Sequence, residues 1–164
     1  ESCKGPVPTD PGQLNLMVVG EAPGENEDRE GVPFIGKAGS LLWQVLNESG
    51  IERDWVSVTN TVRCKGPDNK LPSLSYVNTC QWLAKDINIL QPRFILSLGG
   101  AALYFFKKMK NGITGMSGQT EWHPKWNAWV TYCIHPMAAI YDIKNLPVFQ
   151  KACKEWARIV KTLS

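Results

Sequence analysis

The chain has 164 residues, of which 43% are hydrophobic, and a formal net charge of +3. This length suits one domain with a substantial core, so we expect a single domain over residues 1–164. No apolar run approaches the length of a membrane span, and no charged-then-apolar signal peptide appears in the sequence, which begins at Glu1 rather than Met. These features predict an intracellular protein that acts without a membrane, in a prokaryotic cytoplasm or a virus-infected host cell. Five cysteines, an odd number, argue against a disulfide framework.

Apolar runs alternate with amphipathic runs along the chain after an irregular, proline-rich segment at residues 1–13. The predicted strands are 14–19, 55–60, 94–98 and 130–134. The predicted helices are 40–49, 73–90, 99–106 and 146–163. We expect loops at 61–72 and 107–119 and a hairpin-like excursion at 122–129. This alternation predicts a three-layer α/β/α fold around a mainly parallel four-stranded sheet.

The loop after the first strand is the most informative stretch of the sequence. It carries four acidic residues close together, Glu21, Glu25, Glu27 and Asp28. Phe34 follows on a Pro-Phe turn, and Gly36, Gly39 and Ser40 suit a close approach of backbone N–H groups to an anion. Carboxylates, an aromatic ring and a phosphate-binding turn favour a nucleotide ligand. The alternative is a surface loop with incidental acids.

Three polar residues each follow an apolar strand directly: Glu21, Asn60 and His135. In a parallel sheet the carboxyl ends of the strands lie at one edge, where open α/β folds bind ligands. We therefore expect these three side chains to line one cleft.

Several motifs in this order resemble those of the family 4 uracil-DNA glycosylases. They are Gly20-Glu21-Ala22-Pro23-Gly24 with Pro33-Phe34-Ile35-Gly36; Val58-Thr59-Asn60 with Cys64, Pro67 and Asn69; Leu98-Gly99-Gly100-Ala101; and His135-Pro136. The resemblance runs from about residue 14 to the end of the chain. It implies a uracil-DNA glycosylase-like fold and an enzyme of base excision repair. Such an enzyme flips uracil out of DNA and hydrolyses its N-glycosidic bond, leaving an abasic site.

The resemblance also implies roles for the residues at the strand ends. Glu21 would orient the attacking water and stabilise the sugar cation, and neutral His135 would donate a hydrogen bond to uracil O2. The alternatives are a carboxylate that caps backbone amides and a structural histidine. Cys133 lies near His135, but this chemistry needs no thiol nucleophile.

Four further residues are expected to hold the base. Asn60 would pair with uracil N3–H and O4, and Phe34 would stack on the ring. The backbone after Ala22 would complete the pocket, and Glu27 would stand where the thymine methyl group must be excluded. The alternatives are an Asx turn for Asn60 and a core position for Phe34.

DNA contacts are expected on both sides of the cleft. After His135-Pro136 the family carries bulky apolar residues and a basic one, whereas this chain has alanines and no arginine, so Met137 or Ile140 would act as the wedge. This departure makes single-stranded as well as double-stranded DNA a candidate substrate. The predicted phosphate contacts are Lys37, Ala38, Gly39, Ser40, Lys65, Lys70 and the lysines of 107–110.

The family normally holds a [4Fe–4S] cluster, and the resemblance gives Cys3, Cys64 and Cys80 as ligands. Such clusters use four cysteines, and the fourth ligand is not identified in this sequence. The cluster would tie the N-terminal segment to the region of residues 64–80.

Two other functions fit parts of the sequence. The shortened wedge and incomplete cysteine set favour a catalytically weak DNA-binding module of a replication complex. A related branch that captures uracil covalently carries an extra basic, His-containing loop, and no such insertion lies between residues 39 and 60. We expect a monomeric enzyme.

Overall fold

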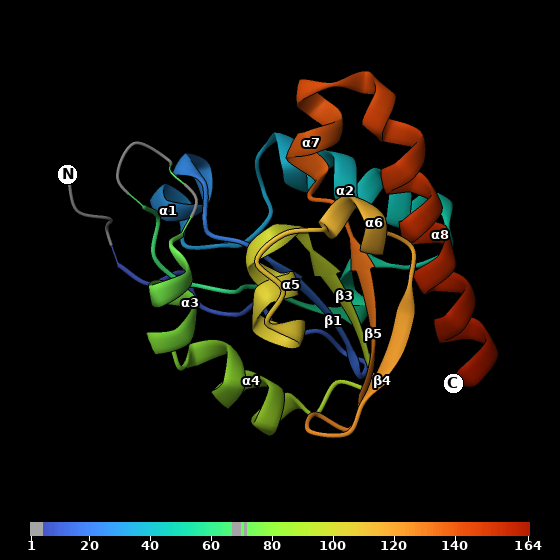
Figure 1. The fold of residues 1–164 in the computed structure, drawn as a ribbon, viewed down its shortest axis with the longest axis horizontal. Helices are drawn as coiled ribbons and strands as arrows, with labels where there is room; N and C mark the ends of the chain where they lie inside the picture. Colours follow the sequence, from blue (N-terminus) through green and yellow to red (C-terminus); the bar gives the residue numbers. More distant parts are fainter. Residues whose placement is uncertain (1–4, 67–69, 71) are drawn as a thin grey trace.

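The computed structural model describes residues 5–66, 70 and 72–164. These residues form a five-stranded sheet in the order β2-β1-β3-β5-β4 (Figure 1). The strands are β1 (Leu16–Gly20), β2 (Val56–Asn60), β3 (Phe94–Leu98), β4 (Thr120–His123) and β5 (Ala128–Cys133). The helices are α1 (Glu25–Glu30), α2 (Lys37–Glu48), α3 (Leu74–Thr79), α4 (Trp82–Leu90), α5 (Gly99–Lys107), α6 (Ile113–Met116), α7 (Pro136–Tyr141) and α8 (Leu146–Leu163). Two 3-10 turns, η1 (Arg53–Trp55) and η3 (Ile143–Asn145), complete the described elements.

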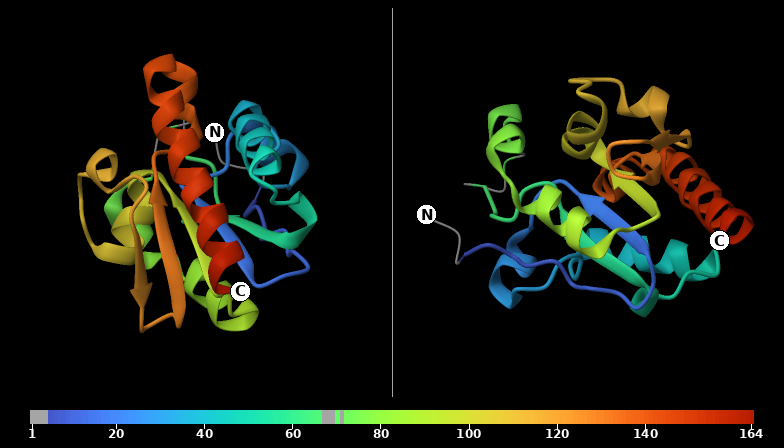
Figure 2. Two further views of the ribbon diagram at one scale, coloured as in Figure 1. Left: turned by 90° about the vertical axis from the view of Figure 1, so that its right-hand side faces the viewer. Right: turned by 90° about the horizontal axis from the view of Figure 1, so that it is seen from below.

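The sheet is covered by helices on both faces. Side chains alternate along a strand, so Leu16 and Val18 of β1 pack into a cluster with α2 and α8. Met17 and Val19 face the opposite way and pack with α4 and α5. Figure 2 shows α8 running along one side of the strands. The predicted three-layer α/β/α fold is confirmed.

The sheet has one strand more than we predicted. Strands β2, β1, β3 and β5 are parallel to one another, whereas β4 pairs antiparallel with β5 as the first arm of a hairpin. The hairpin-like excursion at 122–129 is therefore an edge strand and its turn. Edge strands are only half covered, and the mixed polar sequence of β4 carries little of the apolar signal that marks a central strand.

The helix predicted over 73–90 is wrong in one respect, because it is two helices. Ser73 caps α3 as expected, but Cys80 has extended backbone angles (φ −73°, ψ 117°) and α4 begins only at Trp82. Three short helices, α1, α6 and α7, were not predicted. They have six, four and six residues, too few for a helical period to show in the sequence.

The segment before β1 runs beside β2. The amides of Asp10 and Val58 each donate to the other's carbonyl oxygen at 2.9 Å, and Val7 N donates to Arg63 O at 2.8 Å. Residues 5–13 contain no helix or strand apart from this single bridge. Among the described residues, no helix is long and apolar enough to cross a membrane.

Candidate active site

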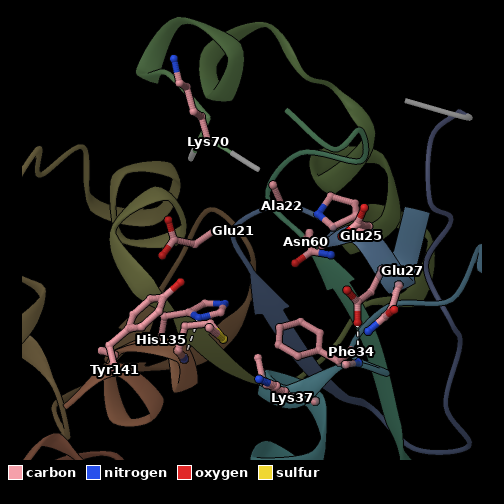
Figure 3. Close-up of a pocket in the computed structure, with 18 residues that line it drawn as sticks. Glu21, Ala22, Glu25, Glu27, Phe34, Lys37, Asn60, Lys70, His135 and Tyr141 are labelled. Carbon is pink, nitrogen blue, oxygen red and sulfur yellow. Dashed lines mark hydrogen bonds between the residues drawn. The ribbon is translucent and has the colours of Figure 1, made fainter. Parts of the chain in front are cut away.

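A cavity of about 690 Å³ opens at the carboxyl edge of the parallel strands (Figure 3). Most of the predicted site residues line it: Glu21, Ala22, Glu27, Phe34, Lys37, Ala38, Gly39, Asn60, Lys70, His135 and Met137. Its walls come from the ends of β1, β2 and β5, the loop between β1 and α2, and the first turns of α2 and α7. The cleft predicted from the strand ends is therefore present.

Glu21 is the buried carboxylate of the site. It is 8% exposed, and the backbone N–H groups of Gly100 and Ala101, at the start of α5, donate hydrogen bonds to it. Burial raises the pKa of the carboxyl group to about 6, and the two amide bonds partly oppose that rise. The side chain is therefore a carboxylate at neutral pH, held against the positive end of a helix.

Gly99 leaves room for the Glu21 carboxylate at the start of α5. In the sequence it was identified only as part of a family motif. Its φ is +85°, and an added Cβ would lie 2.2 Å from Glu21 Oε1. Only glycine combines that backbone with such a close carboxylate. The sequence signal for this role was a glycine directly after a predicted buried strand.

His135 supplies the hydrogen-bond donor. Its Nδ1 accepts from the backbone N–H of Met137 at 3.1 Å, which also caps α7. In the neutral ring the proton must then be on Nε2. Burial lowers the pKa of His135 to about 4, so the imidazole is neutral at physiological pH and presents an N–H that can meet a developing anion.

Asn60 and Phe34 provide the two contacts expected for a planar base. Asn60 ends β2 and is 6% exposed, and Figure 3 shows its amide and the Phe34 ring facing the same cavity. The Phe34 ring lies 6.1 Å from the His135 ring at an interplanar angle of 32°. The cavity therefore offers a ring to stack on, an amide beside it and a donor opposite.

Glu27 lines the cavity but its carboxylate is engaged with the protein. Its Oε2 accepts hydrogen bonds from the amides of Ile35 at 2.8 Å and Gly36 at 2.7 Å. The expected contact with a thymine methyl group stays a prediction. The loop bonds themselves were not foreseen.

Some predicted DNA contacts do not line the cavity, namely Ser40, Lys65, Ile140 and the lysines of 107–110. Lys37 and Lys70 are exposed at its rim, whereas Lys107 pairs with Glu121 at 3.0 Å. Among the lining residues that sequence reasoning overlooked is Tyr141, which is 82% exposed.

Comparison with known proteins agrees with this geometry. The model of the uracil DNA glycosylase superfamily matches residues 7–162. The chain is 38% identical to the type-4 uracil-DNA glycosylase of Sulfurisphaera tokodaii, over 93% of this chain and 71% of that protein. It is 37% identical to the type-4 enzyme of Saccharolobus solfataricus, over 92% of this chain and 74% of that protein. The chain belongs to the type-4 family of the uracil-DNA glycosylase superfamily. A third relative, the type-4 enzyme of Thermotoga maritima, is 45% identical over 56% of this chain and 48% of that protein.

The predicted cluster ligands of this glycosylase-family chain are described only in part. Cys64 is exposed in the loop after β2, and Cys80 is half-buried at the end of α3, against Val62 and Val77. Cys3 lies outside the described residues, as do the motif residues Pro67 and Asn69. Within the described residues no three His, Cys, Asp or Glu side chains are grouped as a metal site. Only two of the predicted ligands belong to that part of the chain.

Replacing Glu21 by glutamine is expected to stabilise the fold above pH 6. The carboxyl pKa is about 6 in the folded chain, against an ordinary value of 4.5. Between these values the unfolded chain has lost a proton that the folded chain still holds, so the free energy of unfolding falls as pH rises. The full loss is about 2 kcal/mol.

Urea unfolding of the parent and Glu21→Gln from about pH 4 to about pH 8 measures this difference. The stabilisation should grow through the interval and level off above pH 6. Asn47→Gln, at an exposed position of α2, changes no ionisable group and is the control, so its effect should be the same at every pH. A stabilisation of Glu21→Gln that is the same at every pH would contradict the assignment.

Proposed function

We propose that this chain removes uracil from DNA by flipping the nucleotide out of the strand and hydrolysing its N-glycosidic bond. The observation that carries the proposal is the trio Glu21, Asn60 and His135, which three separate strands bring to one cavity. The product is an abasic site, as base excision repair requires. The relatives bear the name type-4 uracil-DNA glycosylase.

Each member of the trio meets one need of the reaction. Breaking the bond leaves positive charge on the sugar and negative charge on the base. The Glu21 carboxylate stabilises the sugar cation and orients the water that attacks it. The Nε2–H of His135 donates to uracil O2 as charge develops there. Because this imidazole is neutral, its Nδ1 can accept from the Met137 amide while its Nε2–H donates to the base.

The base is read by its hydrogen-bonding edge. The Asn60 amide oxygen accepts from uracil N3–H, and its NH₂ group donates to O4. Cytosine reverses both groups and leaves two mismatched contacts. Phe34 stacks on the flipped ring, while the backbone after Ala22 and the Glu27 side chain close the pocket around it.

The DNA lies across the mouth of the cavity. Both single-stranded and double-stranded DNA are proposed substrates. The first turn of α2, with Lys37, Ala38 and Gly39, offers backbone N–H groups and one cation to a phosphate. Lys70 adds a cation on another wall, and Met137, which also lines the cavity, serves as the wedge. All these groups belong to one chain, so we propose that the protein acts as a monomer. Because its substrate is DNA, we also propose an intracellular location.

An excision assay tests the proposal. A uracil-containing oligonucleotide is incubated with the protein and treated with hot alkali, which breaks the strand at an abasic site. Glu21→Gln, purified in the same way, controls for host glycosylases and should be slower by about 10²–10³. The rate should fall as pH drops through about 6, where Glu21 takes up its proton. Binding without strand breakage would instead support the DNA-binding module, and a denaturant-resistant adduct would support covalent capture.

Asn60→Asp tests how the base is read. The substitution removes the NH₂ donor and leaves only acceptors, so uracil excision should fall by at least about a hundredfold. Discrimination against cytosine should shrink, because a carboxylate accepts from cytosine N4. Asn47→Asp, exposed on α2, is the control. Uracil excision at the parent rate would show that the base is read elsewhere.

We also propose that Cys3, Cys64 and Cys80 hold a [4Fe–4S] cluster together with a ligand not yet identified. Support comes from the neighbourhood of the two described cysteines. Val7 N bonds to Arg63 O, directly before Cys64, so the N-terminal segment reaches the loop that carries this thiol. The Arg63 guanidinium lies 4.8 Å from the centre of the Trp82 ring, two residues after Cys80, so the same loop reaches the region of the second thiol. When bound, the cluster would link these segments and take no part in the hydrolysis.

Protein purified without oxygen should therefore be brown and absorb broadly near about 400 nm, as thiolate-bound iron does. Cys64→Ser should lose most of the iron. Cys153→Ser, at a buried position in α8, should keep it. Colourless parent protein without iron by elemental analysis would contradict the proposal.

A further inference from the structure

Phe34 has a backbone conformation that phenylalanine rarely adopts. Its φ is +55°, in the left-handed region that favours glycine. The residue is nevertheless 6% exposed and its ring lines the cavity. Such a conformation persists only where the surroundings enforce it, and it is often found at functional sites.

Side chains from three elements hold the backbone on both sides of this residue. Glu27 of α1 accepts from the amides of residues 35 and 36, and the bond from residue 36 is the dashed line beside Glu27 in Figure 3. Trp43 of α2 donates its Nε1–H to the carbonyl oxygen of Phe34 at 3.2 Å. Arg53 of η1 donates from Nη2 to the carbonyl oxygen of Pro33 at 3.4 Å. Four consecutive residues, 33–36, are thus each bonded to a side chain distant in sequence.

The Trp43 and Arg53 contacts support each other. The guanidinium carbon of Arg53 lies 4.2 Å from the centre of the Trp43 ring, and Asp10 accepts from Arg53 Nη2 at 3.0 Å. Arg53 is therefore fixed by an aromatic face on one side and a carboxylate on the other. Gly39, in the first turn of α2, leaves room for the Phe34 carbonyl group, since an added Cβ would lie 2.0 Å from that oxygen.

Neither Trp43 nor Arg53 lines the cavity, so neither side chain meets a bound base. We infer that Trp43 and Arg53 are positioning residues that fix the plane of the Phe34 ring for stacking on the flipped uracil. This inference rests on the proposed function. Stacking depends on ring orientation, and a loop free to leave the left-handed conformation would turn the ring away from the base.

Trp43→Phe tests the inference, because it keeps an aromatic face for Arg53 and removes the Nε1–H donor. Losing one hydrogen bond should lower kcat/KM for uracil excision by about three- to tenfold and weaken inhibition by free uracil by a similar factor. In a Phe34→Ala background the same substitution should change neither quantity, because the ring it positions is absent.

Trp129→Phe is the matched control. Trp129 is a half-buried residue of β5 that packs against Trp122, and its substitution should leave both quantities unchanged. Arg53→Lys, which keeps the charge and loses the planar stacked group, serves as a second variant if Trp43→Phe does not fold. It should give the same dependence on Phe34.

The outcomes separate the inference from the function on which it rests. If the parent excises uracil and Trp43→Phe does so equally well, the inference is overturned and the function stands. An equal loss in the parent and Phe34→Ala backgrounds would mean a general structural role and would also overturn it. A parent that excises no uracil contradicts the proposed function, and the inference with it.

Discussion

Burial of ionisable groups at the carboxyl edge of the sheet is the constraint on which the site depends. Desolvation disfavours charge on Glu21 and on His135 alike. Hydrogen bonds from the amides of Gly100 and Ala101 offset part of the desolvation cost of the carboxylate, so Glu21 still ionises near pH 6. For His135 the cause of the shift is desolvation alone among the described residues, and its Nδ1 accepts from the Met137 amide. One environment thus holds an anion and a neutral donor side by side, as a reaction that separates charge requires.

The fold positions these groups in two ways. Parallel strands bring Glu21, Asn60 and His135 to one edge, and this follows from sheet geometry alone. The stacking ring is positioned differently. It lies on a loop whose backbone conformation is unfavourable by itself and is held by contacts with other elements. Phe34 depends on side chains of other elements, and through Arg53 and Asp10 this dependence reaches the N-terminal segment.

Much of this arrangement could be predicted from the sequence. Buried parallel strands are continuous apolar runs, so the residue that follows each run marks the edge of the sheet. This is why Glu21, Asn60 and His135 were found together. The helix predicted over 146–163 is confirmed as α8. It could be predicted because its eighteen residues repeat the amphipathic pattern over several turns.

The rest could not be predicted because its signals are tertiary. Helices α1 and α7 are shorter than two turns, and the extended backbone at Cys80 interrupts an otherwise continuous helical pattern. Glu27 and Trp43 bond to backbone atoms of the Phe34 loop that lie eight or nine positions away in the sequence. No pattern of residue types encodes such contacts. Tyr141 was overlooked because its exposure, not its identity, sets it apart.

The central claim is that the site keeps Glu21 ionised and His135 neutral with its proton on Nε2. An NMR titration of protein labelled with ¹³C at the glutamate carboxyl carbons and ¹⁵N at the histidine rings tests this directly. The account predicts that the Glu21 carboxyl group titrates near pH 6. It also predicts that His135 shows a bare Nδ1 and a protonated Nε2 until the pH approaches about 4. A His135 ring that becomes doubly protonated near its ordinary pKa of 6.5, or that carries its neutral-state proton on Nδ1, would contradict it.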